Sequence, residues 1–316
     1  MVRKHTLRAA RAAFAVSFGV ALLIGTIGTG NAGAAKSVTT TKPTVVIGTK
    51  NFAEEYILGQ LYGQALAAKG FHVVYKGSFG SSELADTAIR SGKMNFYPEY
   101  TGIIALDLAQ KPSVKETFPK TAHATYIFAK KYENTNGLTL LGPTPFVDSD
   151  TVTVLSSFAD TNHLKTISDL AKLDSFSYAG YPECKTRVTC LVGLKKVYGL
   201  TNIKFVSLGS ISVYTLLDDS SVDSGDGFTT DPQHKSAKYR ALTDTKHIFG
   251  FENVAPVVSE KLLAGKYGTQ LRTISNKVSS LLSPRAMRAM DKAAYSQSGT
   301  PESIAHDFLV ANGMAK

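Results

Sequence analysis

The pattern of apolar and polar residues after position 43 alternates between strand-like and helix-like segments. Residues 44–50 (TVVIGTK) are mostly β-branched and predict a short strand, and residues 54–69 predict an amphipathic helix. Asn51 and Glu54 have the spacing of a capping box at the start of this helix, and Gly70 is placed to end it. The junction after the first strand is where an open α/β sheet holds its ligands.

The same alternation continues to about residue 146, restarts from about 147, and gives way to mainly helical patterns from about 255. Strands that alternate with helices predict mainly parallel sheets, so the expected fold class is α/β. About 280 residues exceed what one compact core usually organises, which predicts two lobes. The acidic segment 218–227 (DDSSVDSGDG) lacks the ordered ligands of a calcium loop, and we expect a solvated loop there.

Residues 1–35 have the features of a secretory signal peptide. A basic start is followed by an apolar stretch at 14–28 and by small residues at 31–35 that suit a signal peptidase. An uncleaved anchor helix is the alternative, because this stretch approaches the length of a membrane span. We therefore expect an exported, extracytoplasmic protein in which residues 36–43 form a linker. No cysteine lies directly after the apolar stretch, so no lipidation site is expected.

Charge and cysteine content narrow the class of function. Without residues 1–35 the chain keeps 31 basic and 25 acidic residues, a formal net charge of +6. The basic residues are scattered, which argues against a nucleic-acid partner. The seven histidines lie far apart, so neither a metal site nor a cofactor is expected. Cys184 and Cys190 are the only cysteines, and in an exported protein the pair predicts a disulfide.

Sequence signatures of enzymes are missing from the chain. It contains no G-x-S-x-G elbow, H-E-x-x-H pair or phosphate-binding P-loop, so the expected function is not enzymatic. Catalytic groups that converge from distant positions in a secreted enzyme are the alternative that a single sequence leaves open.

Seven segments together carry a resemblance to a known family. They are, in chain order, IGTKNFAEEYILGQL (47–61), NFYPEYTG (95–102), TISDLAKL (166–173), PECKTRVTCLVGLKKVYGL (182–200), FTTDPQ (228–233), APVV (255–258) and GTPESIAHDFLVANG (299–313). The chain resembles the glycine betaine/choline-binding proteins of ABC-type osmoprotectant importers along nearly all of its length after the signal segment.

This resemblance implies a type II periplasmic-binding-protein-like fold, in which two lobes are joined by two crossing segments. Lobe 1 would comprise residues 44–146 and 245–316, and lobe 2 residues 147–244. The ligand, a small osmolyte, would bind in the cleft between the lobes, and a monomeric protein would deliver it to an ABC permease. A sensor that presents its closed form to another membrane partner would have the same fold and pocket.

The resemblance also implies a set of binding residues. The family holds a quaternary ammonium against aromatic faces and the ligand carboxylate on cationic groups. Lys50 matches the family's lysine after the first strand, and Tyr100 matches a tyrosine of the aromatic cage. Arg187 matches the anion-binding arginine, on a loop that the disulfide would fix. Phe228 falls where the family usually has a tyrosine.

Three further positions complete the predicted set. Asp150 and Glu252 stand where the family has cage tyrosines. Carboxylates could still attract a trimethylammonium by charge, but desolvating them is expensive. A polyol, amine or polyphenol with hydrogen-bond donors would satisfy them better, unless the two side chains point to solvent. Ser82, with Ser81, is placed to cap a helix or to hold an anionic group of the ligand at its N-terminus.

Overall fold

The computed structural model describes residues 41–109, 119–209 and 211–316. The predicted signal peptide and the first five residues of the predicted linker lie outside the described residues. Within the described residues, no helix combines the length and the apolar character that a membrane span requires.

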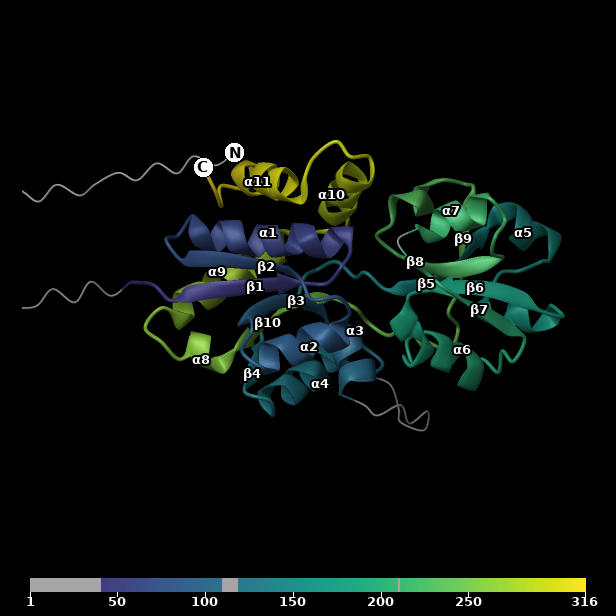
Figure 1. The fold of residues 1–316 in the computed structure, drawn as a ribbon, viewed down its shortest axis with the longest axis horizontal. Helices are drawn as coiled ribbons and strands as arrows, with labels where there is room; N and C mark the ends of the chain where they lie inside the picture. Colours follow the sequence, from purple (N-terminus) through teal and green to yellow (C-terminus); the bar gives the residue numbers. More distant parts are fainter. Residues whose placement is uncertain (1–40, 110–118, 210) are drawn as a thin grey trace, which may run out of the picture. The chain divides into compact units, whose positions relative to one another are not determined.

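The strands form two five-stranded sheets, one near each end of the view in Figure 1. The first sheet has the order β2-β1-β3-β10-β4 and the second β7-β6-β8-β5-β9. The strands of the first sheet are β1 (Thr44–Thr49), β2 (His72–Ser78), β3 (Phe96–Tyr100), β4 (Leu138–Leu140) and β10 (Val254–Ser259). Those of the second are β5 (Asp150–Leu155), β6 (Phe176–Gly180), β7 (Ile203–Ser207), β8 (Ser224–Phe228) and β9 (Tyr239–Leu242).

Both sheets are mixed, and this refines the expected α/β class. In the first sheet β1 runs parallel to β2 and β3, while β10 runs antiparallel to β3 and β4. In the second sheet β6 runs parallel to β7 and β8, while β5 runs antiparallel to β8 and β9. Strands β5 and β10 are entered from the other sheet without a helical crossover, which parallel pairing would require. In each sheet four strands therefore run in one direction, and one strand, β10 or β5, runs against them.

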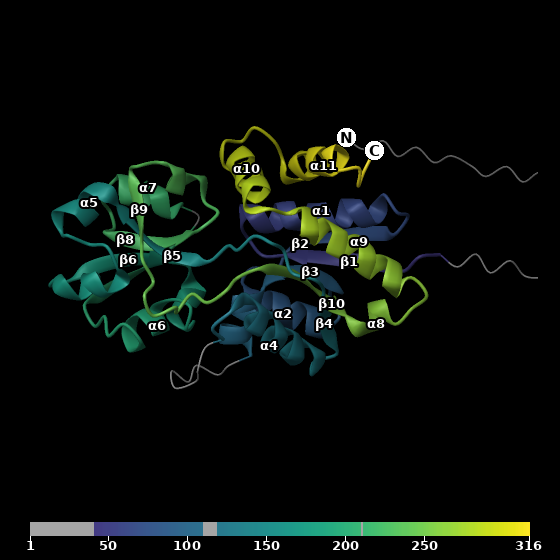
Figure 2. The ribbon, with the colours of Figure 1, turned by 180° about the vertical axis from the view of Figure 1, so that it is seen from behind.

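Helices cover both faces of the first sheet (Figures 1 and 2). One face packs against α1 (Ala53–Ala67) and α9 (Gly268–Leu281), and α10 (Pro284–Tyr295) and α11 (Pro301–Ala311) pack against α1. The other face packs against α2 (Ser82–Arg90) and α4 (Ala122–Asn134). Three short elements complete this part, α3 (Thr101–Ile103), η1 (Ile104–Leu108) and α8 (Glu260–Leu263). Strands β1, β3, β4 and β10 are mostly buried, as their mainly apolar sequences require, whereas most residues of the edge strand β2 are exposed.

The second sheet has shorter helices and two apolar clusters of its own. Its helical elements are α5 (Ser156–Thr161), η2 (Ile167–Lys172), η3 (Pro182–Lys185), α6 (Leu191–Lys196), α7 (Val213–Asp218) and η4 (Pro232–Lys235). Because each sheet has a separate core, each can pack without the other.

Two chain segments connect the sheets, residues 141–149 and 243–253. They run side by side, since Val147 and Asn253 form an antiparallel bridge and the Asp148 N–H donates to the Glu252 carbonyl at 3.0 Å. The two segments are thus paired through their backbones at residues 147–148 and 252–253. The exact lobe boundaries at 147 and 244 stay a prediction.

The start of α1 differs from the expected capping box. Phe52 occupies the N-cap in an extended conformation, and no side chain caps the helix. Glu54 instead accepts a hydrogen bond of 2.6 Å from the Tyr100 hydroxyl, so the capping box of Asn51 and Glu54 was wrong. The end of α1 is as predicted, because Gly70 has a φ of +82° and its N–H donates to the Ala67 carbonyl at 2.8 Å.

The loop expected at 218–227 is also partly wrong, because its last four residues belong to the central strand β8. A side chain on Gly225 would come within 2.2 Å of Val213, and one on Gly227 within 2.6 Å of Thr153. Glycine is therefore needed here for close packing, and it does not mark a turn.

Candidate ligand-binding cleft

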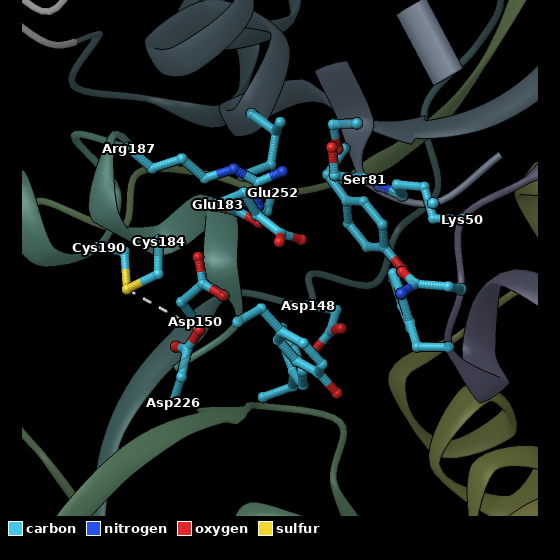
Figure 3. A pocket seen from close by; sticks show the side chains of 18 residues that line it. Lys50, Ser81, Asp148, Asp150, Glu183, Cys184, Arg187, Cys190, Asp226 and Glu252 are labelled. Atoms are coloured by element: carbon cyan, nitrogen blue, oxygen red, sulfur yellow. Dashed lines mark hydrogen bonds between the residues drawn. A yellow bond between two sulfur atoms is a disulfide. The ribbon is translucent and has the colours of Figure 1, made fainter. Parts of the chain in front are cut away.

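One cavity is lined by residues from both sheets and from a connecting segment, and it holds about 620 Å³ of empty space including solvent at its mouth. All seven predicted binding residues line it (Figure 3). They are Lys50, Ser82 and Tyr100 from the first sheet and its helices, Asp150, Arg187 and Phe228 from the second, and Glu252 from the connecting segment 243–253. Segments as far apart as β1 and residue 252 thus meet at one place.

Lys50 follows β1 and is only 4% exposed. Its ammonium pairs with Glu99 and lies 3.7 Å from Glu55. The ammonium also lies 4.0 Å from the centroid of the Tyr100 ring. Burial raises the pKa of Glu55 to about 8, although the neighbouring Lys50 charge opposes the shift. The positive charge of Lys50 is therefore already compensated by Glu99, which does not line the cavity.

The positive charge of Arg187 is also compensated by an acid that does not line the cavity. Its Nε donates to Glu83 Oε1 at 2.9 Å and its Nη2 donates to Oε2 at 3.1 Å. Burial disfavours ionisation of Glu83, but the hydrogen bond and charge of Arg187 outweigh it and lower the pKa of Glu83 to about 2. Glu83 belongs to α2 and Arg187 to the loop after β6, so the pair spans the cleft.

A second link reaches the same loop. Asp107, in η1, accepts hydrogen bonds of 2.7 Å from the Val188 N–H and from the Thr189 hydroxyl. The two links hold the loop between Cys184 and Cys190 against elements of the first sheet.

The predicted disulfide is confirmed: Cys184 is bonded to Cys190. The bond encloses the five residues that include Arg187, and both cysteines line the cavity. The sulfur atoms lie close to a carboxylate oxygen of Asp226. Disulfide sulfurs are not thiolates, so this group does not provide soft ligands for a metal.

Four aromatic residues line the cavity, two of which the sequence reasoning missed. Tyr100 and Phe228 were predicted, whereas Phe52 and Tyr181 were not. The rings of Phe52 and Phe228 are stacked with centroids 5.8 Å apart, and the Phe52 centroid lies 6.1 Å from that of Tyr100. Phe52 follows β1 and Tyr181 follows β6, so their positions at strand ends were an available signal.

Five acids line the cavity: Asp148, Asp150, Glu183, Asp226 and Glu252. Asp150 and Glu252 are 8% and 3% exposed, so the structure buries both rather than turning them to solvent. Burial raises the pKa of Asp150 to about 7, and burial together with Asp150 raises the pKa of Glu252 well above its usual value. Sequence reasoning missed Asp148, Glu183 and Asp226, since nothing local distinguishes them from surface acids.

Glu252 fits its place because of a neighbouring glycine. A side chain on Gly102 would come within 2.5 Å of the Glu252 Cγ atom. The Oε1 atom of Glu252 is buried and has no hydrogen-bond partner among the described residues. A buried carboxylate without a partner costs free energy of folding, so a hydrogen-bond donor or a positive charge in the cavity would stabilise Glu252.

Ser81 and Ser82 lie at the first turn of α2 and both line the cavity. Ser81 occupies the N-cap in an extended conformation, but its side chain makes no capping hydrogen bond. The expectation of an ordinary side-chain cap is therefore not met, and a binding role for Ser82 stays a prediction.

Two α/β sheets joined by two paired segments around a cavity define the periplasmic-binding-protein-like class. Residues 43–311 match the family described as the substrate binding domain of ABC-type glycine betaine transport systems, and the chain belongs to this family. It is a family of extracytoplasmic solute-binding proteins that work with an ABC permease and are not enzymes. The fold class, the family resemblance and the substrate-binding function expected from the sequence are thereby confirmed.

Three relatives of this chain carry the name of a ligand. It is 29% identical over 278 residues to the glycine-betaine-binding protein of Pseudomonas aeruginosa, covering 84% of this chain and 87% of the relative. It is 26% identical to the glycine betaine-binding protein YehZ of Escherichia coli, covering 86% and 92%. The apo structure of YehZ superposes with a TM-score of 0.60 at 25% identity, covering 86% of this chain and 99% of that one.

The third relative has a different ligand in its name. The ergothioneine transport permease/ergothioneine binding protein EgtU of Helicobacter pylori is 26% identical, covering 85% of this chain. This chain spans 48% of that relative's length.

Proposed function

We propose that this protein binds a small quaternary ammonium osmolyte, glycine betaine or choline, in the cavity between its two sheets and delivers it to an ABC permease. The observation that carries the proposal is the group of four aromatic residues, Phe52, Tyr100, Tyr181 and Phe228, around one cavity. A quaternary ammonium has no N–H to donate and is recognised mainly through aromatic faces, each worth about 0.5–2 kcal/mol.

Binding would close the cleft by a hinge motion. Phe52 and Tyr100 belong to the first sheet and its connections, while Tyr181 and Phe228 belong to the second. A ligand that contacts both groups stabilises the arrangement in which they face one another. The connecting segments 141–149 and 243–253 would act as the hinge, which the pairing of Asp148 with Glu252 supports.

The setting of this function is also part of the proposal. Export through the signal segment at 1–35 would place the binding domain outside the cytoplasm, either free after cleavage or held by an uncleaved anchor. The protein would act as a monomer, because delivery to a permease needs each cleft to open and close by itself.

Thermal unfolding tests the proposal. Melting temperatures should be measured with glycine betaine, choline, carnitine and proline betaine, and with a simple polyol and a polyphenol. A ligand at one hundred times its dissociation constant adds about 2.7 kcal/mol, which corresponds to a shift of several degrees for a domain of this size. A shift with a quaternary ammonium supports the proposal. A shift of the melting temperature with the polyol or polyphenol alone would show that the protein binds another class of solute.

A further inference from the structure

We propose that the cleft is selective for a net cation over a zwitterion of similar size, and that Asp150 and Glu252 are the residues that impose this selectivity. The inference rests on the proposed function and narrows it. Within the quaternary ammonium class it favours a ligand such as choline, which has no carboxylate, over glycine betaine.

The first support is the balance of charge around the cavity. Among the residues that the structure describes, five acids and two cations line it. Both cations pair with acids outside the lining, Lys50 with Glu99 and Arg187 with Glu83. None of the five lining acids makes an ion pair within the described residues. The ionisable groups that remain available to a ligand are therefore carboxyl groups, which carry a negative charge once they ionise.

The second support is a buried polar group without a partner. Glu252 is 3% exposed, lines the cavity and has an Oε1 atom with no hydrogen bond among the described residues. Asp150 is 8% exposed and lines the same cavity (Figure 3). A buried carboxylate is stabilised strongly only by an opposite charge or a donor. A cationic ligand supplies that charge, and the aromatic rings nearby accept its methyl groups.

The third support is that Glu83 already occupies the two positive groups that could bind a ligand carboxylate, the N-terminus of α2 and Arg187. The N-terminus of α2 would attract an anion, but the Glu83 carboxylate lies in its first turn. Glu83 also holds the guanidinium of Arg187 at two points. A ligand carboxylate would have to displace Glu83 while it faced the lining acids, and both steps cost binding free energy.

Several charged groups act on these two acids. They come from the second sheet, its disulfide loop, η1, β1 and the connecting segments, and are Lys50, Asp107, Asp148, Glu183, Arg187 and Asp226. Burial raises the pKa of Asp150 to about 7, so lowering the pH to 6 protonates it and weakens its pull on a cation. The affinity for choline should consequently rise from pH 6 to pH 8, whereas that for glycine betaine should rise less.

Calorimetric titration of the purified protein with choline and with glycine betaine, at pH 6 and pH 8, tests the inference. We expect choline to bind at least tenfold more tightly at pH 8. Asp150→Asn and Glu252→Gln keep the side-chain shapes, and each should lower this ratio at least threefold by weakening choline. Asp174→Asn removes an exposed acid away from the cavity and should leave the ratio unchanged. Melting curves of the variants establish that each is folded.

The outcomes separate the two proposals. If neither compound nor any other quaternary ammonium binds, the proposed function fails and the inference fails with it. If glycine betaine binds as tightly as choline or more tightly, the function stands and the inference is overturned. A tenfold preference that survives both Asp150→Asn and Glu252→Gln overturns the role of these residues.

Discussion

Arg187 and Glu83, 104 positions apart in the sequence, form a two-point ion pair across the cleft, with nitrogen–oxygen distances of 2.9 and 3.1 Å. Glu83 belongs to α2 beside the first sheet, and Arg187 belongs to the disulfide-closed loop beside the second. The side chains are 15% and 41% exposed, so solvent screens the pair and its contribution to stability is about 1 kcal/mol or less. The pair matters more for ligand binding, because a guanidinium held by Glu83 is not free to pair with a ligand carboxylate.

Glu83→Gln should therefore change ligand preference. The variant keeps the shape of the side chain, removes its charge and frees Arg187 to meet a ligand carboxylate. We expect glycine betaine to bind severalfold more tightly and choline to bind no better, as measured by calorimetric titration. Asp86→Asn is the matched control, since Asp86 lies on the same helix and pairs with Arg90 away from the cavity. Equal changes for both ligands in Glu83→Gln would contradict this account of Arg187.

Phe228 offers a test of the aromatic contact. Phe228→Leu keeps an apolar side chain of similar size and removes the π face, and Phe228→Tyr restores the residue that the family usually has. The leucine variant should lose about tenfold in affinity for a quaternary ammonium, or about 1.4 kcal/mol, while the tyrosine variant stays close to the original protein. Fluorescence or calorimetric titration measures both. Comparable affinity in the leucine variant would remove Phe228 from the binding surface.

The disulfide should matter more for binding than for folding. A double variant, Cys184→Ala with Cys190→Ala, releases the loop that carries Arg187 and lines the cavity. Closing so short a loop accounts for roughly 2 kcal/mol of stability at most. The rest of the second sheet keeps its own core, so the variant should remain folded. We expect the ligand affinity to fall severalfold; an unchanged affinity would show that the loop is not part of the binding surface.

The buried acid Asp150 predicts a dependence of stability on pH. Its folded-state pKa is raised to about 7, against about 3.9 for an unfolded chain. The folded state therefore binds more protons between these values, and the free energy of unfolding contributed by Asp150 falls as the pH rises through 7. Asp150→Asn should raise the melting temperature of the ligand-free protein at pH 8 and change it little at pH 4.

A shift of about 1 kcal/mol corresponds to ~2–4 °C for a protein of this size, which thermal unfolding resolves. Asp174→Asn, an exposed acid, is the control and should show no such pH dependence. A melting temperature of Asp150→Asn that equals the original at both pH values would mean that Asp150 is solvated in the folded protein.

Much of this architecture is predictable from the sequence because it depends on local pattern. The strand at β1 and the helix at α1 follow from period and composition, and Gly70 ends α1 through its positive φ. The start of α1 is not predictable in this way. Glu54 has the spacing of a capping residue, yet its carboxylate accepts a hydrogen bond from Tyr100, 46 residues away.

The cavity, too, is only partly predictable from the sequence. The family resemblance identified seven residues that do line it, but not the state of their charges. Lys50 is neutralised by Glu99 and Arg187 by Glu83, and both partners are distant in sequence. Asp226 belongs to the acidic segment 218–227, for which the sequence predicted a solvated loop. In the fold those glycines allow close packing of a central strand, which only the neighbouring elements reveal.

The central claim is that a quaternary ammonium binds in the cavity between the two sheets. A crystal structure of the protein with choline tests it most directly. The account predicts the ammonium within about 6 Å of the ring centroids of Tyr100, Tyr181 or Phe228, the distance range of cation–π contacts, with Asp150 or Glu252 facing it. Choline bound elsewhere, with this cavity filled only by water, would contradict the account.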